Sequence, residues 1–230
     1  MSQNSAYSLF DIAGPVMVGP SSSHTAGACK IGQYARALFN AKPTKVIFDL
    51  HGSFGQVFKG HATDRALLGG VMRFRTSDPA IKDAFHIAED RQIAYEFRVT
   101  DLGAEQHANT VKITMEAPGK QAMSVVGSSI GGGKVEIVQV DDFKVSIQDV
   151  AGKYRTLVCL LDDSQEALES LVRIIEKEGV EVKLPCTLPY NGQSLVILRY
   201  RGKRIPVDRL SFFEEMKGVY FVRCLNRIYA

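Results

Sequence analysis

The chain has 230 residues, of which 45% are hydrophobic and 23% charged, and its formal net charge is +3. This balance is typical of a soluble globular protein with one large domain or two smaller ones. Lys and Arg are spread along the chain, so we expect no nucleic-acid partner. No apolar run approaches the roughly 18 residues of a membrane span, and the polar residues 1–10 lack a signal-peptide pattern, which predicts a cytoplasmic protein without membrane association.

The first half of the chain is predicted to mix helices and strands. Periodic apolar residues predict helices over 25–39, 64–72 and 78–89, and a strand over 44–50 followed by a glycine-containing loop at 51–55. The Asp78-Pro79 pair supports the last helix, because Pro is favoured at the first helical position.

Four strand candidates follow, over 93–99, 110–116, 122–128 and 135–140. The alternation of Val111, Ile113 and Met115 with polar residues is the clearest of them. The connecting segments are short, and Gly131-Gly132-Gly133 separates two of the strands. We therefore expect an antiparallel meander.

Residues 149–153 are the best candidate for a domain boundary. Beyond them the patterns predict strands over 154–161, 180–184, 194–200 and 219–228 and helices over 165–177 and 207–216. This β-α-β-β-α-β order is that of the ferredoxin-like unit. The sequence thus indicates an α+β protein with domains over 1–148 and 153–230.

The four cysteines, at positions 29, 159, 186 and 224, form no Cys-x-x-Cys pair and match no metal or cluster spacing. We expect them to be free thiols, either buried as small hydrophobic side chains or exposed at the surface. No metal site is predicted in this chain.

The main polar motif is Gly19-Pro20-Ser21-Ser22-Ser23-His24-Thr25, at the start of a predicted helix. Three hydroxyl groups and exposed backbone N–H groups at a helix N-terminus favour a site for a carboxylate or a phosphate. The alternative is an ordinary serine N-cap, which needs only one of these hydroxyls.

Two further motifs carry imidazoles, at residues 59–64 (KGHATD) and 107–110 (HANT). Imidazoles near neutral pH are suited to proton transfer. The simpler interpretation makes Asp64 a helix cap, His61 a surface residue and Asn109 part of a turn. His86, inside a predicted helix, is interpreted as structural.

Taken in order, these motifs resemble the beta chain or beta domain of the iron–sulfur L-serine dehydratases. The resemblance is carried by Ser8-Leu9-Phe10-Asp11 with residues 19–25, by 51–54 (HGSF) with 60–64, by His107-x-Asn109-Thr110 and by 129–133 (SIGGG). It implies an α/β sandwich like the allosteric-substrate-binding domain of some phosphoglycerate dehydrogenases. The C-terminal unit is similar to an ACT domain.

The resemblance also implies a chemistry. The family converts L-serine to pyruvate and ammonia by β-elimination without pyridoxal phosphate, and a [4Fe-4S] cluster held by cysteines of an alpha subunit assists the departing hydroxyl. This chain would then be inactive without its alpha subunit, and when isolated it would form a homodimer.

Site roles follow from the same resemblance. Ser21, Ser22, Ser23 and Thr25 are expected to hold the substrate carboxylate, with Thr63, Asp64 and Asn109 as further substrate-binding residues. His24 and His61 are the catalytic candidates, for proton transfer or for orienting the substrate, while an alpha-chain residue remains an equal candidate for the base. Asp64 would orient His61 or cap the helix.

Two other functions remain open from the sequence: a regulatory module that binds serine or a related anion without catalysis, and a purely structural dimerisation module. Two departures from the resembled families bear on them. Residues 162–166 (DDSQE) lack the Pro-Gly of ACT domains, which argues against close ligand approach there. Ala62 stands where the dehydratases often have Gly.

Overall fold

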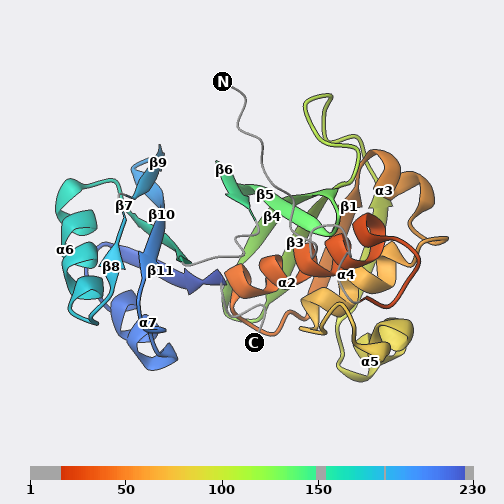
Figure 1. Ribbon diagram of the computed structural model, residues 1–230, viewed down its shortest axis with the longest axis horizontal. Helices are drawn as coiled ribbons and strands as arrows, with labels where there is room; N and C mark the ends of the chain where they lie inside the picture. The colour runs from red at the N-terminus through yellow and green to blue at the C-terminus, as the bar shows by residue number, and fades with distance from the viewer. Residues whose placement is uncertain (1–16, 149–153, 184, 226–230) are drawn as a thin grey trace. The chain divides into compact units, whose positions relative to one another are not determined.

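The computed structural model describes residues 17–148, 154–183 and 185–225 (Figure 1). They divide into two compact units, one formed by residues up to 139 with 146–148, the other by 140–145 with the residues from 154 onward. The chain mixes helices with β-sheets, as expected. The motif at 8–11 and the proposed boundary at 149–153 lie outside the described residues, and no described helix has the length and apolarity to cross a membrane.

The N-terminal unit is built on a six-stranded sheet with the strand order β2-β1-β3-β4-β5-β6. Its strands are β1 (Lys45–Leu50), β2 (Ala94–Val99), β3 (Thr110–Ala117), β4 (Lys120–Gly131), β5 (Lys134–Val140) and β6 (Phe143–Gln148). Its helices are η1 (Ser22–Gly27), α2 (Ala28–Phe39), α3 (Gly52–Val57), α4 (Thr63–Val71), η2 (Pro79–Asp83) and α5 (Ala84–Asp90). The helices and strands predicted in this half are confirmed, and β6 is an additional strand.

The segment predicted as a loop at 51–55 is instead the start of helix α3. Glycines at 52 and 55 lower helix propensity, which is why the sequence pattern missed it. Tertiary contacts override that preference: Phe54 is fully buried, and Gly55 lies against the Leu50 carbonyl, where a β-carbon would be only 3.0 Å from the oxygen.

The prediction that residues 93–99 belong to the antiparallel meander is wrong. Strand β2 pairs with β1 in parallel, at the edge of the sheet, whereas β1 pairs with β3 in antiparallel orientation. A parallel neighbour requires a long crossover, and the helices from α3 to α5 supply it. Only β3 to β6 follow one another in sheet order.

One face of the sheet carries the core of this unit. The register aligns three buried rows across β1, β3 and β4: Leu50-Val111-Gly127, Phe48-Ile113-Val125 and Val46-Met115-Met123. Figure 1 shows α2 lying across this sheet with α4 beside it. The absence of a side chain at Gly127 leaves space for Ile31 of α2, because a β-carbon there would come within 2.7 Å of the isoleucine side chain.

Helices α2 and α4 pack with their backbones almost in contact. A β-carbon on Gly32 would overlap the Leu67 carbonyl oxygen, and one on Gly70 would overlap the Cys29 carbonyl oxygen. Only glycine fits at these two positions, so the spacing of the helix pair is set by backbone rather than by side chains.

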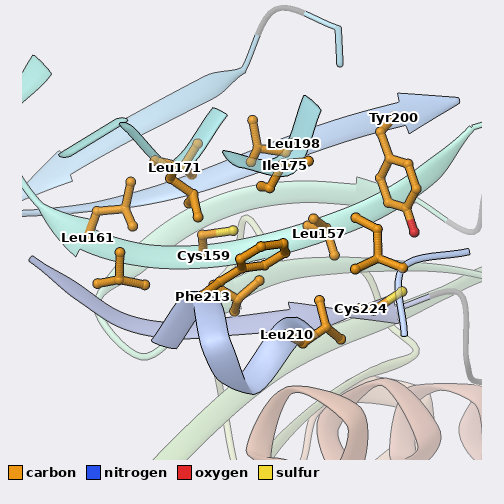
Figure 2. Packing of buried hydrophobic residues seen from close by; sticks show 14 of the residues in the cluster. Leu157, Cys159, Leu161, Leu171, Ile175, Leu198, Tyr200, Leu210, Phe213 and Cys224 are labelled. Carbon is orange, nitrogen blue, oxygen red and sulfur yellow. The ribbon is translucent and has the colours of Figure 1, made fainter. Parts of the chain in front are cut away.

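The C-terminal unit follows the predicted order, with β7 (Arg155–Asp162), α6 (Gln165–Glu176), β8 (Glu181–Val182), β10 (Gln193–Arg201), α7 (Val207–Glu214) and β11 (Val219–Cys224). Strand β9 (Cys186–Tyr190) is an addition that pairs with β10, and the other strands lie in the order β11-β7-β10-β8. Figure 2 shows the core, in which Leu171 and Ile175 of α6 and Phe213 of α7 pack on Leu157, Cys159 and Leu198 of the sheet.

The packing of α2 on α4 makes a stability prediction. The variant Gly70→Ala is expected to lose at least about 2 kcal/mol of unfolding free energy, because the added methyl group overlaps backbone atoms that cannot rotate away. Urea denaturation measures this loss. The matched control is Gly60→Ala, where the nearest atom to the new β-carbon is 3.7 Å away; equal stability of the two variants would contradict the account.

Candidate functional site

The serine-rich motif forms a single wide turn, the π-helix η1, before α2 begins. Ser21 is its N-cap, and its Oγ accepts a hydrogen bond of 3.2 Å from the backbone N–H of His24. One serine therefore does serve as the cap that the simpler interpretation required. Ser22 and Ser23 sit half-buried in the turn itself, where irregular helix turns often mark functional sites.

His24 is held by hydroxyl groups on both ring nitrogens. Its Nδ1 lies 3.3 Å from Ser21 Oγ, and its Nε2 lies 3.0 Å from Ser53 Oγ in α3. Ser21 Oγ has two lone pairs, so it can accept from both the backbone N–H and Nδ1–H of His24. In that tautomer Nε2 carries a lone pair directed at the Ser53 hydroxyl.

The second imidazole, His61, lies edge-on against the first, with the ring centroids of His24 and His61 5.0 Å apart. Thr25 is fully buried and donates from Oγ1 to the His61 carbonyl at 3.2 Å, which ties the two motifs together. The next residue, Ala62, has a left-handed backbone with φ of 55°. This conformation favours glycine, so the alanine at this position is tolerated at some cost in backbone strain.

The third motif reaches the same region from the sheet. Asn109 precedes β3, and its carbonyl accepts a hydrogen bond of 2.9 Å from the Ser129 N–H of β4. This pair continues the β3–β4 pairing past the buried row that contains Val111 and Gly127. Ser129 is fully buried against η1, since a β-carbon on Gly27 would overlap its Oγ. The loop is also a turn, as the simpler interpretation held, because His107 Nδ1 accepts from the Asn109 N–H at 3.1 Å.

Four buried polar atoms of these motifs have no hydrogen-bond partner among the described residues. They are His61 Nδ1, Thr63 Oγ1, Asn109 Oδ1 and Ser129 Oγ. Native structures satisfy most buried polar atoms, and each unsatisfied one costs about 1–3 kcal/mol. Four such atoms on adjoining motifs are therefore available to a polar ligand or to water.

The electrostatics of the site keep His24 neutral. Burial, followed by the neighbouring His61, lowers the pKa of the His24 imidazole below its ordinary value. At neutral pH the ring therefore offers one N–H and one lone pair, which is the state that can accept or pass on a proton.

Asp64 lies in the first turn of α4. Its Oδ1 accepts from the Arg65 N–H at 2.8 Å, so it satisfies an N-terminal backbone donor of the helix. It lines a pocket of about 830 Å³ walled by aromatic rings, including Phe85 and Phe97. Burial raises the pKa of the Asp64 carboxyl.

Two serines at the site were not among the predicted site residues. Ser53 contacts His24, and Ser129 contacts the turn at Gly27. Both belong to the motifs at 51–54 and 129–133, so their presence inside polar motifs was the available signal. His86, in contrast, is a largely exposed residue of α5 beside Asp90, consistent with its structural interpretation.

The cysteines are free thiols, as predicted: Cys29, Cys159 and Cys224 are buried and Cys186 is exposed. Burial raises the pKa of the Cys29 thiol to about 12, whereas an iron–sulfur cluster requires thiolates. Within the described ranges no three His, Cys, Asp or Glu side chains are grouped to hold a metal ion. The four cysteines, all of which lie in the described part of the chain, are therefore not placed to hold a cluster.

Comparison with known proteins identifies the family. The family model described as serine dehydratase beta chain matches residues 5–95, which include both imidazoles. The chain is 45% identical to the L-serine dehydratase beta chain of Peptoniphilus asaccharolyticus over 66% of its own length and 67% of that protein. It is 42% identical to a probable L-serine dehydratase beta chain of Bacillus subtilis (strain 168), over 76% and 77%.

The chain belongs to the serine dehydratase beta chain family. It also matches L-serine dehydratase 2 of Escherichia coli (strain K12), at 31% identity over 63% of this chain and 35% of that protein. The family model ends at residue 95, so it does not cover Asn109 and Ser129. These two residues are assigned to the site by the fold alone.

The lowered His24 pKa predicts how stability depends on pH. Above the ordinary value of 6.5 the ring is neutral in both states, but as the pH falls below 6.5 the unfolded chain takes up the proton first. The wild-type protein should therefore lose more unfolding free energy between pH 7.5 and 5.5 (roughly one unit on either side of that value) than His24→Gln, as measured by urea denaturation. Equal losses would contradict the burial of His24.

The contribution of Asp64 to the unfolding free energy changes with pH in the opposite direction. Because its folded-state pKa is raised, the folded protein takes up the proton first, and this group adds stability as the pH falls through its folded pKa towards the unfolded value of 3.8. The stability advantage of Asp64→Asn over the wild type should shrink over that range. An advantage that stays constant with pH would show that the carboxyl is not buried.

Proposed function

We propose that this chain is the beta subunit of an L-serine dehydratase, an L-serine ammonia-lyase, that is inactive until it joins a cluster-bearing alpha subunit. The observation that carries the proposal is the set of four unpartnered buried polar atoms around the His24–His61 pair. Membership of the serine dehydratase beta chain family supports L-serine as the ligand.

The substrate carboxylate is assigned to the η1 turn. The hydroxyls of Ser22 and Ser23 and the backbone N–H groups at the start of the turn are the assigned hydrogen-bond donors, and the helix dipole favours negative charge there. Thr25 supports the turn, because its hydroxyl donates to the His61 carbonyl. The free polar atoms of Thr63, Asn109 and Ser129 then serve the remaining polar groups of the substrate. L-serine offers an ammonium group and a hydroxyl in addition to its carboxylate, so its groups can satisfy donors and acceptors alike.

The reaction removes the α-proton and the β-hydroxyl of L-serine as water and leaves 2-aminoacrylate. This enamine tautomerises to the imine, which takes up one water and releases pyruvate and ammonia. We assign proton transfer to His24, whose neutral ring carries a lone pair on Nε2 beside the Ser53 hydroxyl. His61 is assigned to orienting the substrate through its free Nδ1. The closely packed surroundings hold both rings in place, which favours an oriented reaction.

The iron–sulfur cluster is assigned to the alpha subunit, since the cysteines of this chain do not fit one. The C-terminal unit is proposed to be an ACT-like domain that pairs with another subunit rather than senses a ligand. Asp162 and Asp163, where an ACT ligand would approach, already accept hydrogen bonds of 2.7 Å and 2.6 Å from Tyr220 and Ser194. We also propose that the protein is cytoplasmic and that the isolated chain forms a homodimer.

Anaerobic pyruvate formation from L-serine tests the proposed function. The chain alone should form no pyruvate, and the chain mixed with its alpha partner and reconstituted cluster should form it. If the mixture is inactive although the cluster is intact, the proposal fails. Saturable serine binding by the isolated chain would then favour the regulatory role, which the anion-binding character of η1 also suits.

The two imidazoles give a sharper prediction. In the assembled enzyme His24→Ala and His61→Ala should each lower kcat by about 10²–10⁴, the usual contribution of general acid–base groups. The thermal midpoint should change little, because neither ring belongs to the apolar rows of the sheet. His86→Ala is the matched control, an exposed imidazole that should keep wild-type turnover. Wild-type turnover in both site variants would remove the pair from the mechanism.

A further inference from the structure

A second pocket lies where α2 and α4 end. It has a volume of about 360 Å³ and is lined by four basic residues, Arg36, Lys42, Arg73 and Arg91, against an apolar wall that includes Ile93. No Asp or Glu is among its lining residues. Of these cations Arg73 lies close enough to Arg36 to act on its charge. Because no carboxylate lines the pocket to offset the positive charge, an anion is the ligand that this arrangement favours.

Arg36 is the central residue of this basic pocket. It lies in the last turn of α2, half-buried, and its NH1 is a buried atom that has no hydrogen-bond partner in the described part of the chain. Burial, and then the charge of Arg73, lower the pKa of Arg36 to about 10, which still leaves the guanidinium charged at neutral pH. A charged, buried and unpaired donor is costly unless a ligand pairs with it.

The other two arginines depend on the segment that follows α4: Arg73 belongs to it, and Arg91 contacts it. Arg73 has a left-handed backbone with φ of 70° and donates its N–H to the Gly70 carbonyl at 2.9 Å. Arg91 donates to the Met72 carbonyl at 3.3 Å and stacks on the Phe74 ring, 5.3 Å from its centroid. The pocket is therefore held by backbone and aromatic contacts rather than by acidic partners.

Helix capping alone does not account for the pocket. A cation near the C-terminus of α2 is favourable for the helix dipole, which explains one arginine there. It does not explain why the buried NH1 of Arg36 lacks a partner in a pocket that three further basic residues line. Guanidinium groups bind phosphate in a bidentate manner, and the volume suits a phosphate with a small organic group.

We propose that the basic pocket formed by Arg36, Lys42, Arg73 and Arg91 binds a phosphate group, either inorganic phosphate or a small phosphate monoester. It is distinct from the candidate site, which lies at the opposite ends of the same two helices. Arg36 lies near the C-terminal end of α2, and the N-terminal end of that helix follows the turn with His24. Arg73 follows the C-terminal end of α4, and that helix begins at Thr63. A bound phosphate thus contacts both helices that position the candidate site.

Calorimetric titration of the full chain tests this pocket. Inorganic phosphate and methyl phosphate would be titrated separately at constant ionic strength, with chloride as the exchanged ion. We expect saturable binding of at least one of them, and the tighter ligand distinguishes free phosphate from an ester. Arg36→Gln and Arg73→Gln should each weaken binding at least about tenfold, the effect of losing one charge-assisted hydrogen-bond pair.

Lys82→Gln is the matched control, because Lys82 is an exposed cation of η2 outside the pocket and loses the same charge. It should bind as the wild type does. Arg73 is exposed, so Arg73→Gln keeps the test valid even if the half-buried Arg36 proves necessary for folding. No saturable binding of either phosphate compound, or an Arg73→Gln variant that binds as tightly as Lys82→Gln, would overturn the proposal.

Discussion

The approach of α4 to α2 leaves no room for a β-carbon at Gly32 or Gly70, and the position of both imidazoles depends on it. Helix α2 continues from the turn that carries His24, and α4 begins just after His61. When the two helix backbones touch, their N-terminal ends come together, and the centroids of the two rings lie 5.0 Å apart. The backbone contact of the helix pair is therefore what turns two separate polar motifs into one site.

The polar atoms gathered there reduce stability. Buried oxygens and nitrogens without partners disfavour the folded state by about 1–3 kcal/mol each, a cost that is tolerated where a ligand is to be bound. The neutral state of His24 arises in the same way, because burial and a second imidazole disfavour its charged form. The apolar rows of β1, β3 and β4 provide the compensating burial immediately next to the site.

Local patterns were enough to predict α2, α4, α5 and most strands, because their apolar spacing is regular. Helix α3 was missed since its two glycines disfavour a helix, and only the burial of Phe54 and the close approach of Gly55 reveal why it forms. The parallel placement of β2 depends on a long crossover that no local pattern encodes. At the site the motifs were predicted, but the contact of Ser53 with His24 and the free oxygens of Asn109 and Ser129 required the fold, as did the pocket around Arg36.

The central claim, that L-serine binds against His24 and His61, is tested most directly by NMR of ring-labelled histidines in this chain within the assembled enzyme. The chain has five histidines, so the signals can be assigned by substitution. The account predicts that L-serine shifts the His24 and His61 resonances saturably and raises the lowered pKa of His24, because the added carboxylate favours imidazolium, while the resonances of the exposed His86 are unchanged. Saturable turnover of L-serine with unaltered His24 and His61 signals would place the substrate elsewhere and contradict the account.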